Sequence, residues 1–314
     1  MAAQELLWLS LSDIAAQIQR QEVSPVELTG AVLERLEHLN PRLNAFITIL
    51  GEQALHAAQR AEQDVLAGRR CGPLHGVPLA LKDIFAMRGV RTTAGSQVLA
   101  SWVPDEDATV VARLKAAGAI LVGTLNLYEF ATGAVLNPHY GPTHNPWHLD
   151  HTTGGSSTGS GAEGAAAREP WIRSRREVYG VDLRERMHLG LLVPATAYLK
   201  AQRRRAAVRR DLEQAFEKVD MLATPTAAIP APKLDAGPGE IGAPTGALLG
   251  TLRRLTQPFN ITGSPAVTVP CGFSRDGLPI GLQLVGRPFE EARLLNLAYA
   301  YEQSTPWKDR HPAL

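Results

Sequence analysis

The sequence, 314 residues long, is poor in the features that mark several specialised classes of protein. It has only two cysteines, Cys71 and Cys271, so we expect neither a disulfide framework nor a metal cluster, and the reducing cytoplasm is the default location. The formal net charge is +1, which gives no overall attraction to nucleic acid or to membranes. No stretch approaches the roughly 20 apolar residues that span a bilayer. Residues 1–9 lack the basic flank and apolar region of a signal peptide. We therefore expect a cytoplasmic protein with no membrane and no nucleic-acid partner.

The length and the composition allow one large globular domain or two small ones. Hydrophobic residues make up 45% of the chain, which is usual for globular proteins, and a chain of this length can bury a substantial core. The sequence shows no internal repeat and no boundary between domains. We therefore expect a single domain over residues 1–314.

Strand and helix patterns alternate in the first half of the chain. Residues 77–81 and 119–123 are the apolar runs of buried strands. Between them, residues 108–118 have a helical pattern of apolar residues, with Gly118 as the C-terminal stop. A strand, a helix and a strand with short connections are typical of a βαβ unit, and therefore of an α/β fold.

Local signals predict further elements. Ser24 is followed by a proline and, three residues on, by a glutamate, which is the pattern of a helix start, and Asn40-Pro41 should end this helix. Near the C-terminus, residues 274–277 join two strand-like runs as a hairpin.

A lysine follows the first buried strand directly. The segment from Gly72 to Asp83 contains that strand, and Lys82 stands at its end. Functional side chains of α/β proteins gather at strand ends and in the loops beyond them. The ordinary alternative is a solvated lysine in a loop, because lysine is seldom buried.

A run rich in glycine and serine occupies the middle of the chain. From Thr152 to Ala167 it holds five glycines and three serines in sixteen residues. Glycine lets the backbone approach a ligand closely, and a serine hydroxyl becomes nucleophilic beside a base. A flexible linker would have a similar composition. The residues before the run, from Tyr140 to Trp147, are of the kind that fixes a loop, which favours a site.

Together, the two segments resemble the amidase signature family. That family has G-x-L-x-G-x-P-x-x-x-K-D early in the chain and a G-G-S-S-[GT]-G-[ST] loop later, and both patterns occur here in that order. Residues 124–130 also resemble its T-N-x-x-E-[FL] segment, which borders the active-site cleft. The resemblance implies an α/β fold with a mixed β-sheet between helices. It also implies hydrolysis of the carbon–nitrogen bond of a small amide without a cofactor.

The resemblance also implies roles for single residues. In the family, a lysine, a serine in a cis peptide and a nucleophilic serine relay a proton. Lys82 matches the lysine base and Ser156 matches the cis-serine. Gly154, Gly155 and Ser157 match the loop that binds the substrate.

One part of the family pattern is missing. The nucleophile belongs to a G-T-D-x-x-G-S-[IV]-R segment, and this sequence has none. We interpret this as an internal deletion with its junction near residues 163–172. Ser174 lies among arginines without a glycine turn, so we do not assign it as a substitute. We expect impaired catalysis, and low solubility or homo-oligomerisation because lost strands would expose sheet edges.

Other interpretations remain open. Residues 155–159 fit G-x-S-x-G with Ser157 as nucleophile, but that motif needs a strand directly before it. A phosphate-binding loop would need a Gly-Lys-Ser/Thr ending. A non-catalytic remnant or an amide-binding protein fits the missing nucleophile. The basic segment 168–210 lacks the alternating aromatic residues of a single-strand nucleic-acid binder, so we interpret it as solvated helix faces.

Overall fold

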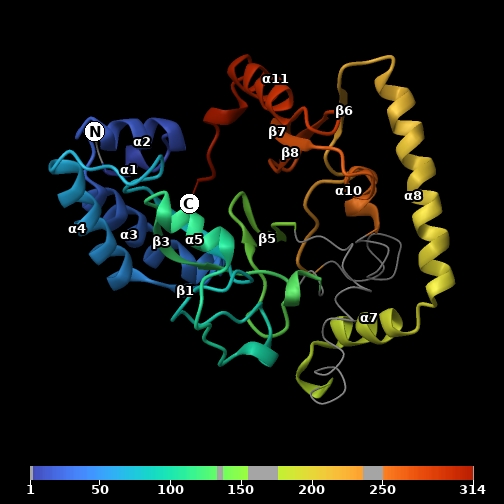
Figure 1. Ribbon diagram of the computed structural model, residues 1–314, viewed down its shortest axis with the longest axis horizontal. Coiled ribbons are helices and arrows are strands. Elements are labelled where there is room, and N and C mark those ends of the chain that lie inside the picture. Colours follow the sequence, from blue (N-terminus) through green and yellow to red (C-terminus); the bar gives the residue numbers. More distant parts are fainter. Residues whose placement is uncertain (1–2, 133–136, 155–175, 236–249, 314) are drawn as a thin grey trace. The chain divides into compact units, whose positions relative to one another are not determined.

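A computed structural model describes residues 3–132, 137–154, 176–235 and 250–313 (Figure 1). The contacts between residues divide the chain into two compact units. Unit 1 consists of Met1–His144 and Gly155–His188, and unit 2 of Asn145–Gly154 and Leu189–Leu314. The single domain expected over residues 1–314 stays a prediction.

Unit 1 contains a small sheet and the helices around it. Its helices are α1 (Ala3–Leu6), α2 (Leu11–Gln19), α3 (Pro25–Leu43), α4 (Gly51–Leu66), α5 (Thr109–Ala116) and most of α7 (Val181–Leu191). Its strands are β1 (Phe46–Ile49), β2 (Pro78–Lys82) and β3 (Ile120–Leu125). Short 3-10 helices lie at η1 (Gln97–Leu99), η2 (Glu129–Ala131) and η3 (Arg176–Val178).

The sheet of unit 1 is mixed, in the order β1-β3-β2. β1 runs antiparallel to β3, whereas β2 runs parallel to it and reaches it through α5. The βαβ unit predicted from the sequence is therefore confirmed.

Helices cover both faces of this sheet. Ile120 and Val122 pack in one core cluster with Leu33 of α3 and with alanines of α4. Leu121, between them, packs in another cluster with Val111 of α5. This alternation follows from the period of two along a strand. The mixed sheet between helices, expected from the sequence, is confirmed.

Helix α3 agrees with its predicted start but not with its predicted end. The Ser24 side chain accepts hydrogen bonds from the backbone N–H groups of Val26 and Glu27, which is the capping role expected of it. The predicted stop at Asn40-Pro41 is wrong, because the helix runs on to Leu43. A proline removes one backbone hydrogen bond, and the last turn continues until Asn44 closes it in the left-handed conformation.

Unit 2 is built on an antiparallel sheet with the order β6-β8-β7. Its strands are β6 (Leu222–Pro225), β7 (Ala266–Phe273) and β8 (Pro279–Val285), and its helices are α8 (Ala195–Phe216), α10 (Gln257–Thr262) and α11 (Glu291–Gln303). The short strands β4 (His144–Asn145) and β5 (His148–Thr152) pair with each other, and η4 (Trp307–Asp309) lies near the C-terminus. The predicted hairpin is confirmed, since β7 and β8 pair around residues 274–277.

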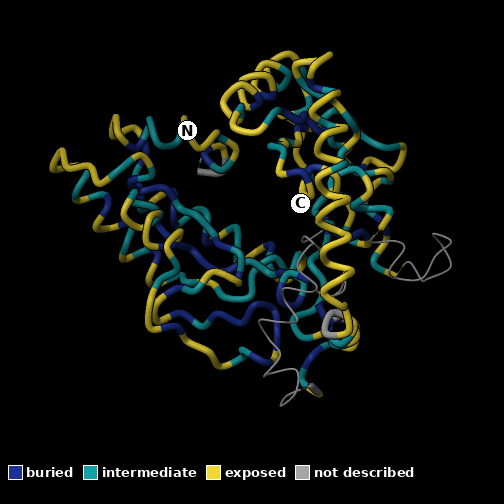
Figure 2. The backbone as a smooth tube through the Cα atoms, turned by 45° about the vertical axis from the view of Figure 1, so that its right-hand side comes forward, coloured by how far each residue is buried: buried dark blue, intermediate teal, exposed yellow. Residues whose placement is uncertain are grey.

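The long helix α8 is packed at one end and open along most of its length. Phe216, at its C-terminal end, is buried with Phe259 and Val285. The residues from Ala195 to Asp211 are almost all exposed (Figure 2). Among the described residues, no helix is both long enough and apolar enough to cross a membrane.

Candidate active site

Lys82 is the last residue of β2, where it pairs with Leu125 of the parallel strand β3. It therefore stands at the carboxyl edge of the parallel pair, as the sequence predicted. Its side chain is partly buried, and this burial lowers the pKa of the Lys82 amine below its usual value. The physical cause is the loss of water around the charged form. A larger fraction of Lys82 is consequently neutral, and only the neutral amine has a lone pair that can accept a proton.

The residue after Lys82 fixes the end of the strand. The side chain of Asp83 is fully buried, and its Oδ2 accepts hydrogen bonds from the Thr93 hydroxyl and, at 2.9 Å, from the Thr93 N–H. Its backbone N–H donates to the carbonyl of Leu125 at 3.0 Å, and its own carbonyl accepts from the N–H of Ala94. Asp83 thus joins β2, β3 and the loop at Thr93, and this holds the backbone of Lys82 in place.

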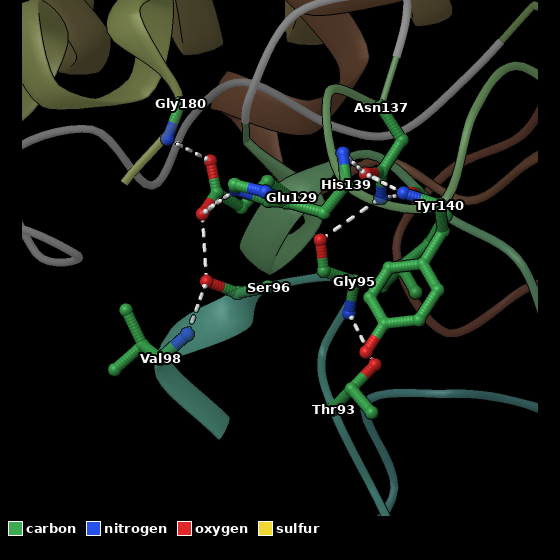
Figure 3. Close-up of polar contacts among 10 residues, drawn as sticks. Thr93, Gly95, Ser96, Val98, Glu129, Asn137, His139, Tyr140 and Gly180 are labelled. Carbon is green, nitrogen blue, oxygen red and sulfur yellow. Dashed lines mark hydrogen bonds and ion pairs between the residues drawn. The ribbon is translucent and has the colours of Figure 1, made fainter. Parts of the chain in front are cut away.

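A buried carboxylate lies beyond the end of β3 (Figure 3). Glu129 is 1% exposed. Its Oε1 accepts a hydrogen bond from the Ser96 hydroxyl at 2.6 Å and lies 3.2 Å from Nε2 of His139. Its Oε2 accepts from the backbone N–H of Gly180 at 3.0 Å. Glu129, in the segment that resembles the family's cleft border, is therefore a bridge between three segments.

A buried amide supports the same region. The side-chain NH₂ of Asn137 donates to the carbonyls of Gly95 and Leu127 at 2.9 and 2.7 Å. Its Oδ1 accepts from the N–H groups of His139 and Tyr140. All the hydrogen-bonding capacity of this amide is used within unit 1, which fixes the loop that carries His139 (Figure 3).

Sequence reasoning missed these partners. Thr93, Ser96, Asn137 and His139 carried no assigned role. Ser96 and Glu129 are 33 positions apart, and Asn137 and Gly95 are 42 apart, so no local pattern connects them. The available signal was the polar stretch 92–96 in the connection after β2, which has the composition of an ordinary loop.

The serine loop falls mostly outside the described residues. Gly154 is described: its backbone has a φ of +75°, in the left-handed region, and its N–H donates to Oγ1 of Thr152 at 3.4 Å. Gly155, Ser156 and Ser157 lie outside the described residues, and so does the predicted junction at 163–172. The roles assigned to them from the resemblance stay predictions.

Other features of unit 1 offer different chemistry. A cavity of about 290 Å³ between the turn after α1, helix α3 and the start of β1 is lined mainly by apolar side chains. The Arg35 guanidinium lies over the Trp8 ring there, 4.6 Å from its centroid, and the lining includes no candidate nucleophile. Within the described ranges, one group of side chains could hold a metal ion, namely Asp64, Cys71 and His75.

Comparison with known protein families gives a clear match. The family model described as Amidase matches residues 27–171 and 170–295. A glutamyl-tRNA(Gln) amidotransferase subunit of Moorella thermoacetica is 29% identical over 489 aligned positions, covering 99% of both chains. The corresponding subunit of Cyanothece sp. is 27% identical over 485 positions, covering 97% of this chain and 100% of the relative.

Solved structures share the fold. An amidase crystal structure has a TM-score of 0.86 at 21% identity and covers 94% of this chain and 100% of its own. A bacterial aryl acylamidase of the amidase signature enzymes has a TM-score of 0.82 at 16% identity, covering 96% and 97%. A 6-aminohexanoate cyclic dimer hydrolase has a TM-score of 0.79 at 20% identity, covering 98% and 99%. These similarities confirm the α/β fold class predicted from the sequence.

Proposed function

The chain belongs to the amidase family, and on this premise we propose that it keeps the lysine half of an amide-hydrolysing site. Lys82 is the proton acceptor, and Ser156 is the hydroxyl that passes the proton on. Gly154, Gly155 and Ser157 contact a small amide substrate. The bond to be cleaved is the carbon–nitrogen bond of that amide.

The observation that carries the proposal is the environment of Lys82. A general base must be neutral at the working pH, and burial lowers the pKa of this amine in the required direction. The Asp83 contacts with Thr93 and Leu125 hold the lysine backbone at the strand end. A solvated loop lysine would have neither feature.

The same proposal includes a loss of catalytic power. The nucleophile segment is missing from the sequence, and an internal deletion near residues 163–172 accounts for its absence. Two findings support the deletion. The two parts matched by the family model meet at residues 170–171. The alignment with the Moorella relative spans 489 positions and this chain has 314 residues, so at least 175 positions stand opposite gaps in it. Loss of a triad serine costs on the order of 10⁶ in turnover in another hydrolase, so we expect weak hydrolysis or none.

A serine-reactive fluorophosphonate tests the proposal. We expect labelling on Ser156, Ser157 or Ser160 that Lys82→Ala slows at least tenfold, because the neutral lysine activates the hydroxyl relay. Lys115→Ala is the matched control: Lys115 is an exposed lysine of α5, paired with Asp107, and its loss should leave the label rate unchanged. Equal labelling of the wild type and Lys82→Ala would refute the role of Lys82, and rapid amide turnover would refute the loss of catalytic power.

A second candidate is amide binding without hydrolysis. It is favoured by one specific combination, namely an intact anchor for Lys82 and a missing nucleophile segment. Calorimetric titration with small linear amides, beside a hydrolysis assay on the same sample, separates the two functions. Binding without any turnover supports the second candidate, whereas weak turnover that Lys82→Ala abolishes supports the first.

We also propose that the chain associates with copies of itself. The large exposed apolar residues of the segment from α7 to α8 include Leu192 at 76% and Tyr198 at 59% exposure. Exposed apolar side chains promote association where they form continuous surface. The cytoplasmic location and the lack of a nucleic-acid partner stay predictions from composition.

A further inference from the structure

Three side chains with metal-binding atoms converge where α4 gives way to the segment before β2. Asp64 lies in the last turn of α4, and Cys71 and His75 follow in the connecting segment. A carboxylate oxygen, the thiol sulfur and a ring nitrogen from the three all lie within 4.8 Å of one another. Thiolate, imidazole and carboxylate together are a ligand set that suits Zn²⁺.

The imidazole of His75 is oriented as a ligand would be. Its Nε2 lies 3.2 Å from the backbone carbonyl of Ala61, and its Nδ1 accepts the N–H of Cys71 at 3.3 Å. Nε2 is therefore the protonated nitrogen, and the lone pair of Nδ1 accepts the backbone N–H of Cys71. Metal-binding histidines usually donate their other ring N–H to a carbonyl or carboxylate in this way.

Backbone hydrogen bonds to residues 117 and 118 fix the segment that carries His75. Leu74 and Gly76 donate their backbone N–H groups to the carbonyls of Ala117 and Gly118, each at 3.0 Å. His75, between them, is only 6% exposed. A preformed position for at least one ligand lowers the entropy lost on binding.

The surroundings of Asp64 and Cys71 determine how tightly a cation would bind and how it would reach the site. Both hydrogen bonds from Arg69 to Asp64 go to the same oxygen, Oδ1, which leaves Oδ2 for a cation. The Arg69 charge opposes a cation and should weaken its binding. Cys71 is exposed, so an ion has a path from solvent.

We propose that Asp64, Cys71 and His75 form a Zn²⁺ site, with water as the fourth ligand. Ligand atoms around a tetrahedral zinc lie about 3.3–3.8 Å apart, given bonds of about 2.0–2.3 Å. The three side chains therefore draw together on binding, and Nδ1 exchanges the Cys71 N–H for the metal. The bound ion links the end of α4 to the segment before β2. This link does not depend on amide hydrolysis.

Titration of the whole chain with Zn²⁺, and with Co²⁺ as a spectroscopic probe, tests the site. We expect one equivalent to bind and a sulfur-to-cobalt charge-transfer band in the near ultraviolet. Cys71→Ser should abolish the band, and Asp64→Asn should weaken Zn²⁺ binding at least tenfold. Cys271→Ser is the matched control, since this second thiol is in β7 of unit 2 and should leave both readings unchanged.

Further variants separate a built site from a reactive thiol. His75→Asn should weaken binding as Asp64→Asn does, and if this buried variant unfolds, the half-buried Asp64 still decides the matter. Arg69→Ala should tighten binding more than Arg70→Ala, because both remove one charge but only Arg69 occupies the Asp64 carboxylate. Binding lost in Cys71→Ser but unchanged in Asp64→Asn would overturn the proposal in favour of a lone thiol. Absence of binding at millimolar Zn²⁺ would overturn it outright.

Discussion

At the scale of single residues, the buried carboxylate of Glu129 joins segments that are far apart in the sequence. Ser96, His139 and Gly180 all contact it. Ser96→Ala removes one donor from this buried acceptor, so we expect the free energy of unfolding to fall by about 1–3 kcal/mol. Urea unfolding measures the change. Ser101→Ala, at an exposed position a few residues on, should change stability by less than about 0.5 kcal/mol. Equal effects would mean that the Ser96–Glu129 bond contributes nothing.

The lowered pKa of Lys82 has a thermodynamic consequence with a definite sign. Between the folded and unfolded pKa values the unfolded chain binds more protons, so stability rises with pH through this window. The penalty for burying the charged amine is complete below the folded pKa and is gone above the unfolded value, near 10.5. Lys82→Met removes this dependence. We therefore expect its melting temperature, minus that of the wild type, to decrease as pH rises from 7 toward 10.

Lys115→Met supplies the comparison for this measurement. Lys115 is exposed and pairs with Asp107, so its loss removes a weak surface ion pair. Its melting difference should stay nearly constant over the same pH range. A flat difference for Lys82→Met as well would contradict the burial of a titrating amine.

Residue-level prediction succeeded where the signal was local. Ser24 as a cap, Gly118 as a stop and Lys82 at a strand end each follow from neighbours in the sequence. The Ser96–Glu129 contact could not be predicted, because it depends on two loops meeting across the fold. The count of only two cysteines also led us to expect no metal cluster. It missed the group around Cys71, because the other two members are an aspartate and a histidine.

At the scale of elements, the end of α5 depends on one glycine. Gly118 has a φ of +89°, and a Cβ there would lie 2.6 Å from Cα of His75. Gly118→Ala therefore adds a steric clash to the cost of the left-handed conformation, and we expect a loss of more than about 1 kcal/mol. Gly68→Ala is the matched control, because Gly68 has a φ of +71° with open space around it. Chemical unfolding should rank Gly118→Ala as the more harmful, and the reverse order would contradict the clash.

Elements were predicted better than their boundaries. The strands β2 and β3, the helix between them and the β7–β8 hairpin follow from hydrophobic period and turn chemistry. The end of α3 did not, because Pro41 fits within the last turn and Asn44 supplies the stop. The left-handed conformation of Asn44 ends the helix, whereas the rule that a proline ends a helix gave the wrong position.

At the scale of the whole molecule, the open surface of α8 predicts association. Leu199 is 56% exposed on this helix. Leu199→Glu should reduce self-association at least several-fold, because it places a charge on apolar surface. Sedimentation velocity at several concentrations measures this. Lys200→Glu, which changes charge at the next position without removing apolar surface, should have a smaller effect. A monomeric wild type at all concentrations would contradict the proposal.

The family could be predicted from two short motifs, whereas the boundaries of the two compact units could not. Motifs such as the one that ends in Lys82-Asp83 depend on chemistry that a few residues carry. The division into two units depends on contacts between distant segments, such as Asn145–Gly154 with the chain after Leu189. No local pattern at residue 145 or 189 marks that division.

The pairing of β2 with β3 also determines how well the position of Lys82 tolerates substitutions nearby. A slip of one residue between two strands turns every side chain to the opposite face, and Lys82 would then leave its position. Backbone bonds from Leu74 and Gly76 to residues 117–118 fix the entry to β2, and Asp83 fixes its exit. These contacts hold both ends of the five-residue strand in register with β3, although the pairing shifts by one residue between Leu79 and Ala80. Substitutions inside β2 should therefore change the stability of the protein without moving Lys82. The position of its amine should then tolerate sequence changes in the rest of the strand.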